Sequence, residues 1–176
     1  MSDFFTKTDL SRKDAENIIS ETLNNCDDGE LYLENSKSES IVLDDDKIKS
    51  SSYSSDLGYG LRAVTGEVVA YSHSNEISRN SLKQSANNLS STLKSQKGIY
   101  NHEIPKTNEK LYKDINPIDE KSLESKLELL KKVNSYTRAK GGIVQQVTAS
   151  FAGEYKSIEI IRSGGEVLTD VRPLIR

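Results

Sequence analysis

A run of alternating apolar and polar residues between Leu31 and Ser74 limits the possible folds of this chain more than any other feature. Within each part of the run, apolar side chains recur at every second position, and clusters of Ser, Asp, Lys and Gly lie between the parts. A period of two places the apolar side chains of a strand on one face, and polar clusters mark reversals of the chain. The pattern therefore predicts four or five antiparallel strands in a meander with one buried face. The apolar positions are Leu31, Leu33, Ile41, Leu43, Leu57, Tyr59, Leu61, Ala63, Val69 and Tyr71.

Three stretches have the apolar spacing of amphipathic helices instead, at about 11–25, 78–95 and 119–140. The first opens with Ser11, a residue type that is typical of helix N-caps. In the third stretch the spacing predicts one buried stripe. The residues of this stripe are Leu123, Leu127, Leu130 and Val133. Strand alternation then returns, and the expected later strands cover residues 147–151, 158–161 and 167–171.

Together these elements predict an α+β fold. Helices cover one face of an antiparallel β-meander sheet, and a long helix and further antiparallel strands follow. We expect an N-terminal α+β meander domain over 1–100 (helix, four to five strands, helix) and a connecting loop over 101–117. Residues 118–176 are expected to form a helix plus strands that continue into a C-terminal catalytic domain.

The composition excludes several classes of function. The 176 residues carry a net charge of −3, with Lys and Arg scattered among nearly equal acids, so no basic surface for nucleic acid is expected. No segment has the roughly 20 apolar residues of a membrane span or the apolar core of a signal peptide. The one cysteine, Cys26, cannot form an internal disulfide, which favours a reducing compartment. We expect a cytoplasmic protein that binds neither nucleic acid nor a membrane.

The segment Gly58-Tyr59-Gly60-Leu61-Arg62-Ala63 matches the relaxed dinucleotide fingerprint G-x-G-x-x-A. That fingerprint works only between a strand and a helix, because the helix N-terminus binds the pyrophosphate. Here another strand is expected after Ala63, and no acidic residue follows at the required distance. The favoured interpretation is that the glycines let the strand bend or let another part of the backbone come close.

Histidine and cysteine residues do not form a recognisable metal motif. His73 and His102 are the only histidines, and His102 begins a sequence like H-E-x-x-H in which position 106 is Lys. Pro105 would also break the helix that such a motif needs. A zinc site needs three or four converging ligands, and Cys26 has neither a second cysteine nor a histidine near it in sequence. We interpret the histidines as surface residues and Cys26 as a packing residue at a helix end.

Charged residues in the strand region have structural interpretations. Asp44, Asp45 and Asp46 suit a solvated turn, since neighbouring strand residues point to opposite faces and would not all reach one cation. Arg62 and Arg172 lie inside strand-like runs, where a guanidinium pairs with a carboxylate across the sheet or binds an anionic or peptide ligand. Pairing is the favoured interpretation. The residues alone therefore indicate a binding or scaffold module, with no catalytic, cofactor-binding or metal-ligating residue assigned.

Several segments, with their order and spacing kept, resemble the N-terminal region of the TldD/PmbA peptidases. They are GELYLE at 29–34, SSSY at 50–53, GYGLRAV at 58–64 with Gly66, KLELL at 126–130, YTRA at 136–139, IVQQVTAS at 143–150 and DVRPLIR at 170–176. The last of these resembles the TldD branch in particular. In one departure from the family, the turn Cys26-Asp27-Asp28-Gly29 replaces the usual Gly-Ala-Asp approach to the first strand.

The resemblance implies a cytoplasmic zinc metallopeptidase that cleaves unfolded or short peptides. It also implies assembly as a dimer, with a TldD/PmbA-type partner subunit. In the family, the zinc ligands lie further along, on an H-E-x-x-x-H helix and near the C-terminus, and the Glu of that motif would polarise the zinc-bound water. The 176 residues contain no H-E-x-x-x-H, so no catalytic or zinc-binding residue is transferred to them.

The strand-like ending at 171–176 predicts a piece of a longer protein, with a short C-terminal edge strand as the alternative. Three hypotheses follow. The first is the N-terminal part of a TldD-like zinc metallopeptidase that is inactive by itself and serves in structure, dimerisation and the substrate chamber. The second is a stand-alone peptide- or protein-binding module with the same fold. The third, a nucleotide-binding enzyme, requires a helix directly after Ala63.

Overall fold

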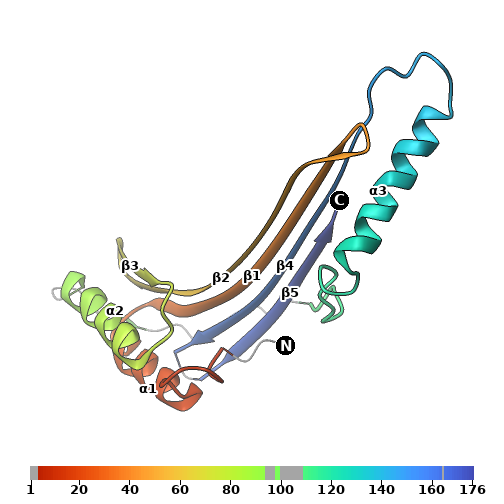
Figure 1. Cartoon of the computed structure of the whole chain (residues 1–176). Coiled ribbons are helices and arrows are strands. Elements are labelled where there is room, and N and C mark those ends of the chain that lie inside the picture. The colour runs from red at the N-terminus through yellow and green to blue at the C-terminus, as the bar shows by residue number, and fades with distance from the viewer. Residues whose placement is uncertain (1–3, 94–97, 100–108, 164) are drawn as a thin grey trace. The chain divides into compact units, whose positions relative to one another are not determined.

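The computed structural model of the protein describes residues 4–93, 98–99, 109–163 and 165–176. In this part of the chain, five strands form one antiparallel sheet in the order β3-β2-β1-β4-β5 (Figure 1). The helices are α1 (Arg12–Leu23), α2 (Arg79–Thr92) and α3 (Leu123–Arg138). The strands are β1 (Asp28–Asp44), β2 (Lys47–Thr65), β3 (Val68–Ser74), β4 (Thr148–Arg162) and β5 (Val167–Ile175). The predicted α+β class is therefore confirmed.

The strands are fewer and longer than the alternation predicted. Residues 31–74, all of them described, form three strands instead of four or five. The chain reverses at Asp45 and Asp46, which have positive φ values of 46° and 67°, as a two-residue hairpin turn requires. The polar stretch at 34–40 stays in β1, because a polar segment does not end a strand while it has a partner strand to bond. For the same reason 147–151 and 158–161 belong almost entirely to one strand, β4.

The chain packs into two compact units, and each unit contains parts of β1, β2, β4 and β5. Unit 1 comprises Met1–Asn35, Asp56–Leu111 and Ser157–Asp170, and unit 2 comprises Ser36–Ser55, Tyr112–Lys156 and Val171–Arg176. The linear division into 1–100, 101–117 and 118–176 stays a prediction. Residues 101–108 of the loop expected at 101–117 lie outside the described residues.

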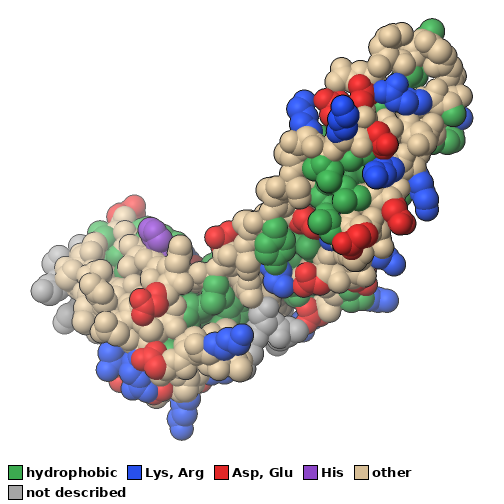
Figure 2. Space-filling view, in the orientation of Figure 1, with side chains coloured by type: hydrophobic (Ala, Val, Ile, Leu, Met, Phe, Trp, Pro, Cys, Tyr) green, Lys and Arg blue, Asp and Glu red, His purple; other side chains and the backbone are tan. Residues whose placement is uncertain are grey.

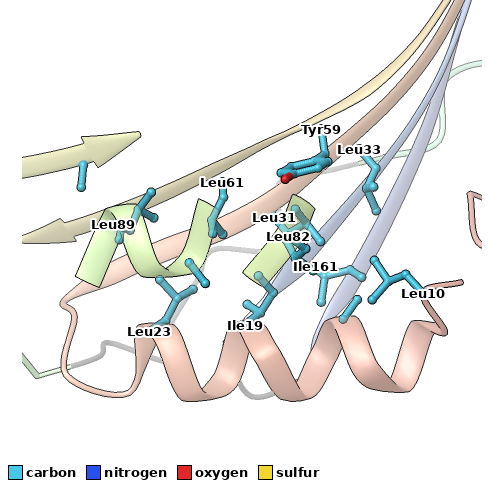
Figure 3. Packing of buried hydrophobic residues seen from close by; sticks show 14 of the residues in the cluster. Leu10, Ile19, Leu23, Leu31, Leu33, Tyr59, Leu61, Leu82, Leu89 and Ile161 are labelled. Carbon is cyan, nitrogen blue, oxygen red and sulfur yellow. The ribbon is translucent and has the colours of Figure 1, made fainter. Parts of the chain in front are cut away.

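Unit 1 is held together by a hydrophobic core between the sheet and the helices α1 and α2 (Figure 3). Ala15, Ile19 and Leu23 recur every four residues of α1 and are fully buried. Ser11 caps this helix and accepts a hydrogen bond from the N–H of Asp14 at 3.1 Å, as predicted. The buried residues of α2 that join this core are Leu82, Ala86 and Leu89. From the strands come Leu31, Leu33, Tyr59, Leu61, Ala63, Ala70 and Ile161.

The prediction that Val69 and Tyr71 face this core is wrong. In the β2–β3 ladder, Ala70 lies opposite Ala63 and Tyr71 lies opposite Arg62. Residues that face each other across a ladder share one face of the sheet. Ala70 therefore faces the core with Ala63, while Val69 and Tyr71 are 60% and 63% exposed on the other face. The period of two alone does not say which set of β3 residues faces the core; the register with β2 decides it.

The first part of β2 is exposed along its whole length. All residues from 47 to 57 are exposed, including Leu57, which the alternation wrongly placed in the core. Along β2, the first residue that belongs to the core of unit 1 is Tyr59, two residues later. The pairing with β3 also begins at Tyr59, so within the described chain residues 47–58 have a neighbouring strand on one side only.

Gly29 marks a close approach of β1 to β2 and to the end of α1. A Cβ atom at this buried position would lie 2.6 Å from the carbonyl oxygen of Arg62 and 2.6 Å from Cδ2 of Leu23. Overpacking of this kind costs about 1–3 kcal/mol, and we expect Gly29→Ala to reach about 3 kcal/mol because one of the two contacts is backbone. Chemical unfolding followed by circular dichroism measures the loss. Gly142→Ala is the matched control, because no atom lies within 4 Å of the position that its methyl group would take; an equal loss in both variants would contradict the close approach.

Unit 2 has two smaller clusters of apolar residues, and α3 packs against the sheet at the first of them. The first cluster consists of Ile41, Leu43, Leu130 and Ala149, with Leu127 and Phe151 packed against it. The second consists of Ile118, Tyr155 and Val171.

The buried face of α3 differs from the predicted stripe. The buried residues are Lys126, Leu130 and Asn134, whereas Leu123 and Val133 are 44% and 43% exposed. Of the predicted stripe, Leu130 is buried and Leu127 is partly buried. The predicted stripe counts apolar residues only, whereas a paired lysine can also be buried. The geometry of this pair is described below.

Candidate functional site

Arg62 lies on the outer face of β2 in unit 1, within a group of carboxylates. Its Nε donates to Oε1 of Glu30 at 2.7 Å, and its Nη2 donates to Oδ2 of Asp28 at 2.6 Å. Nη2 of Arg162 donates to the other oxygen of Asp28 at 2.5 Å. The hydrogen bonds that Arg62 donates to Glu30, and after them the one that it donates to Asp28, raise the pKa of Arg62 above its ordinary value. The predicted cross-sheet pairing of Arg62 is thus present, and both of its partners are already engaged.

Arg172, the other arginine singled out from the sequence, lies on β5 in unit 2 with an exposed side chain. Its pairing with a carboxylate stays a prediction.

The dinucleotide fingerprint at 58–63 lies in the middle of a strand. β2 continues to Thr65, and β3 follows after a turn at Gly66. A Cβ atom on Gly58 would come within 2.8 Å of the carbonyl oxygen of Ser74, so this glycine permits a close approach of backbone to backbone, as expected. The third hypothesis needed a helix after Ala63, and the strand there excludes a fingerprint-type nucleotide site.

The residues considered as metal ligands are not brought together. His73 is exposed on β3, and its ring stacks on Tyr71 with 5.8 Å between the centroids. Cys26 is buried just after α1, and His102 lies outside the described residues. Within the described ranges, no three His, Cys, Asp or Glu side chains form a group that could hold a metal ion. These residues therefore do not form the zinc site that the family resemblance implies. The absence of any zinc ligand from residues 1–176 stays a prediction.

Cys26 has the properties of a packing residue. It is 3% exposed, and its Sγ lies 3.8 Å from the carbonyl oxygen of Thr22. Burial is the main cause that raises the pKa of the thiol, and a protonated, inaccessible thiol is a poor nucleophile. We expect Cys26 to react with a colour-forming disulfide reagent only when unit 1 unfolds, so that the rate follows denaturant concentration. Reaction at the speed of a free thiol in the native state would contradict its burial.

The aspartates at the β1–β2 turn accept hydrogen bonds from other residues of the chain. Asp44 accepts hydrogen bonds from Gln146 at 2.8 Å and Thr148 at 3.0 Å, and these lower the pKa of its carboxyl group, the bond from Gln146 most. Asp45 accepts a hydrogen bond from the N–H of Val147 at 3.0 Å and pairs with Arg138. The turn is thereby joined to the start of β4 and to the end of α3, so the prediction of a turn is confirmed.

A buried ion pair under α3 was not expected from the sequence. Nζ of Lys126 donates to Oε2 of Glu39 at 2.5 Å and to the carbonyl oxygen of Ile118 at 2.7 Å. Lys126 is 5% exposed, and Glu39 is also largely buried. The only signal in the sequence was the position of Lys126 four residues before Leu130, on the buried side of the helix. The ammonium group thus joins α3 to β1 and to the segment before the helix.

Beside this ion pair, unit 2 has a groove of about 460 Å³. Its lining comes from α3, from the segment before α3, and from β4 and β5. The lining residues are Pro117, Glu120, Lys121, Ser125, Lys126, Glu128, Leu129, Lys132, Phe151 and Ile175. The lining combines apolar surface with charged residues and contains no His or Cys, so its chemistry suits docking better than catalysis.

In the part of the chain that the structure describes, no helix is long and apolar enough to cross a membrane.

Two family models match the chain. Residues 29–92 match "PmbA/TldA metallopeptidase domain 1" and residues 116–176 match "PmbA/TldA metallopeptidase central domain". Among curated proteins, a metalloprotease TldD homolog of Buchnera aphidicola from Acyrthosiphon pisum is 34% identical over 151 residues, which is 85% of this chain and 31% of that protein. A metalloprotease TldD homolog of Haemophilus influenzae is 34% identical over 158 residues, 86% of this chain and 32% of that protein.

Solved structures share the fold at lower sequence identity. A putative modulator of DNA gyrase from Bacteroides thetaiotaomicron has a TM-score of 0.69 at 19% identity, and the match covers 93% of this chain and 39% of that one. TldE from Thermococcus kodakarensis has a TM-score of 0.64 at 13% identity, and the match covers 92% of this chain and 38% of that one. The chain spans about a third of the length of the curated relatives it matches. With both family models matched in order, the chain belongs to the PmbA/TldD family of metallopeptidases.

Proposed function

We propose that this chain is the N-terminal, non-catalytic portion of a TldD-type zinc metallopeptidase that degrades unfolded or short peptides. One observation carries the proposal: the chain matches the first and the central domain of the family, in that order. The match spans about a third of the relatives' length. The sequence 1–176 contains no H-E-x-x-x-H. On this proposal, that motif and the chemistry belong to a portion of the polypeptide beyond residues 1–176.

The proposed role of the chain is to form a wall of the proteolytic chamber and to help hold an extended peptide. Residues 47–57 of β2 are exposed, and their outer edge has no neighbouring strand in the described chain. A free strand edge offers main-chain donors and acceptors to an extended peptide, which is how β-augmentation works. Five of these residues are serines, so the edge would recognise backbone with little preference for side chains, as an enzyme for unfolded peptides requires.

We further propose that the protein works in the cytoplasm as a dimer with a TldD/PmbA-type subunit. The homology to proteins named TldD and the structural likeness to TldE support the assembly. The buried, unpaired thiol of Cys26 suits a reducing compartment.

A comparison of the 176-residue chain with a polypeptide that extends through the H-E-x-x-x-H region tests this proposal. We expect the longer polypeptide to cleave an unfolded fluorogenic peptide and to lose this activity on treatment with a chelator. The chain 1–176 should cleave nothing under the same conditions. Peptidase activity in the short chain would contradict the proposal, whereas an open reading frame that ends at Arg176 without any such motif would favour the stand-alone binding module.

A further inference from the structure

Asp27 lies in the turn between α1 and β1 and uses both oxygens of its carboxylate. Figure 2 shows Asp and Glu side chains at several places on the surface around α1 and α2, so acidity alone does not distinguish this turn. Its hydrogen bonds distinguish it. Oδ2 of Asp27 accepts a hydrogen bond from the N–H of Gly66 at 2.7 Å, and Oδ1 accepts one from the N–H of Ile99 at 2.8 Å. One carboxylate thus joins the β2–β3 turn to the chain that follows α2.

Gly98 and Ile99, which we call the strap, lie directly against this turn. The N–H of Gly98 donates to the carbonyl oxygen of Asn25 at 2.7 Å, beside the bond from Ile99 to Asp27. A Cβ atom on Gly98 would lie 2.6 Å from the backbone nitrogen of Asp27 and 2.6 Å from its Oδ1. The approach is therefore so close that only glycine fits without a shift of the backbone.

The strap has no apolar anchor. The side chain of Ile99 is 89% exposed, and none of the described residues between Leu93 and Ile118 is buried. Polar contacts at the surface open at a much lower free energy than a hydrophobic core does, because water competes for their donors and acceptors. The attachment of the strap to unit 1 therefore depends on hydrogen bonds that can open locally.

The carboxylate of Asp27 is held in place by contacts other than those of the strap. The backbone N–H of Asp27 donates to the carbonyl oxygen of Val64 at 2.8 Å, and the bond from Gly66 fixes Oδ2. The bond from Gly66, and after it the bond from Ile99, lowers the pKa of the Asp27 carboxyl group. An ionised carboxylate is a stronger acceptor than a neutral group. The strap thus meets a charged acceptor that is already oriented.

We propose that Asp27 is a clasp that holds the connection between the two matched domains against unit 1 and releases it while the core stays folded. The family models match residues 29–92 and 116–176, so the strap lies in the connection between them. With the clasp closed, the connection leaves unit 1 at Ile99. With the clasp open, the nearest buried anchor before it is Leu93, at the end of α2. The clasp therefore sets the residue from which the central domain is tethered.

Amide hydrogen exchange of the 176-residue chain, followed residue by residue by NMR, tests the clasp. The N–H of Ile99 should exchange about 10–100 times more slowly than in an unstructured peptide, because it is bonded to a carboxylate. It should exchange faster than the N–H of Ile19, which lies inside α1 and in the core of unit 1. Exchange of Ile99 at the rate of an unstructured peptide, or as slowly as that of Ile19, would overturn the proposal.

The variant Asp27→Ala removes both acceptor oxygens. The N–H groups of Ile99 and Gly66 should then exchange at least about tenfold faster, while the exchange of Ile19 stays as in the wild type. Asp56→Ala is the matched control, because Asp56 is an exposed aspartate of unit 1 on β2, and it should change neither rate. An exchange rate of Ile99 that Asp27→Ala leaves unchanged would show that other groups hold the strap, and the clasp would be wrong.

The variant Gly98→Ala separates the strap from the turn. The added methyl group displaces the strap from Asp27, whereas the bond from Gly66 remains. We expect exchange at Ile99 to become about tenfold faster and exchange at Gly66 to stay unchanged. Gly142→Ala, where the methyl group meets no atom within 4 Å, is the control.

Two results with Gly98→Ala would contradict a fixed carboxylate from which the strap detaches alone. One is a strap that stays protected at Ile99, and the other is a release of Gly66 as strong as in Asp27→Ala. The exchange rates need no peptidase activity, so they test the clasp independently of the function proposed above.

Discussion

Replacing Lys126 with methionine lowers the free energy of unfolding of unit 2 by about 3–5 kcal/mol, the cost of breaking a buried ion pair. Methionine keeps the length and the apolar part of the side chain. It removes the ammonium group that lies 2.5 Å from Glu39 and 2.7 Å from the carbonyl oxygen of Ile118. The carboxylate of Glu39, largely buried, is then left without a cation, and the carbonyl without a donor.

Chemical unfolding followed by circular dichroism measures this loss. The control is Lys131→Met on the same helix, where the side chain is exposed and the change should stay within about 0.5 kcal/mol. A double variant, Lys126→Met with Glu39→Gln, should recover a large part of the loss, because no uncompensated charge stays buried. Equal stability of the two single variants would show that Lys126 is not buried in solution.

Leu61→Ala is expected to cost about 2–5 kcal/mol, whereas Leu57→Ala, four residues earlier on the same strand, should cost less than about 1 kcal/mol. The two leucines have the same parity along β2, and the alternation of the sequence treats them alike. Leu61 is fully buried in the core of unit 1, and Leu57 is 43% exposed. Truncation of Leu61 leaves a cavity among the residues of α1 and α2, whereas truncation of Leu57 removes a side chain that water already reaches.

The two leucine variants are compared by their unfolding midpoints in denaturant at equal slope. A loss of similar size for both would contradict the boundary of the core at Tyr59. It would also restore the simple rule that every second residue of β2 is buried.

Hydrophobic periodicity predicts those parts of the fold that depend on local patterns. Helical spacing in α1 and α2 is predictive because both helices pack on one largely apolar core, so Ile19 and Leu82 point inward. The cap at Ser11 and the turn at Asp45 depend on local backbone chemistry and are visible in the sequence for that reason. The ends of strands are not visible in the sequence, because β1 continues through the polar stretch 34–40 while β2 lies beside it.

Other features depend on partners that are distant in the sequence. The face of β3 follows from the register that pairs Ala70 with Ala63, and no local pattern contains that register. Lys126 is buried because Glu39, 87 positions away, supplies its counter-charge. The docking groove likewise combines α3 with residues from two strands, β4 and β5. By contrast, the structural role of Arg62 could be predicted, because an arginine within a strand usually has an acid on the neighbouring strand.

On the proposed function, residues 1–176 provide architecture, and the metal is bound elsewhere in the polypeptide. The zinc content of the purified 176-residue chain decides this, measured by elemental analysis after incubation with zinc and removal of the unbound ion. We expect no stoichiometric zinc in a chain that is folded as judged by circular dichroism. One tightly held zinc ion per folded chain would show that the metal site lies within these residues.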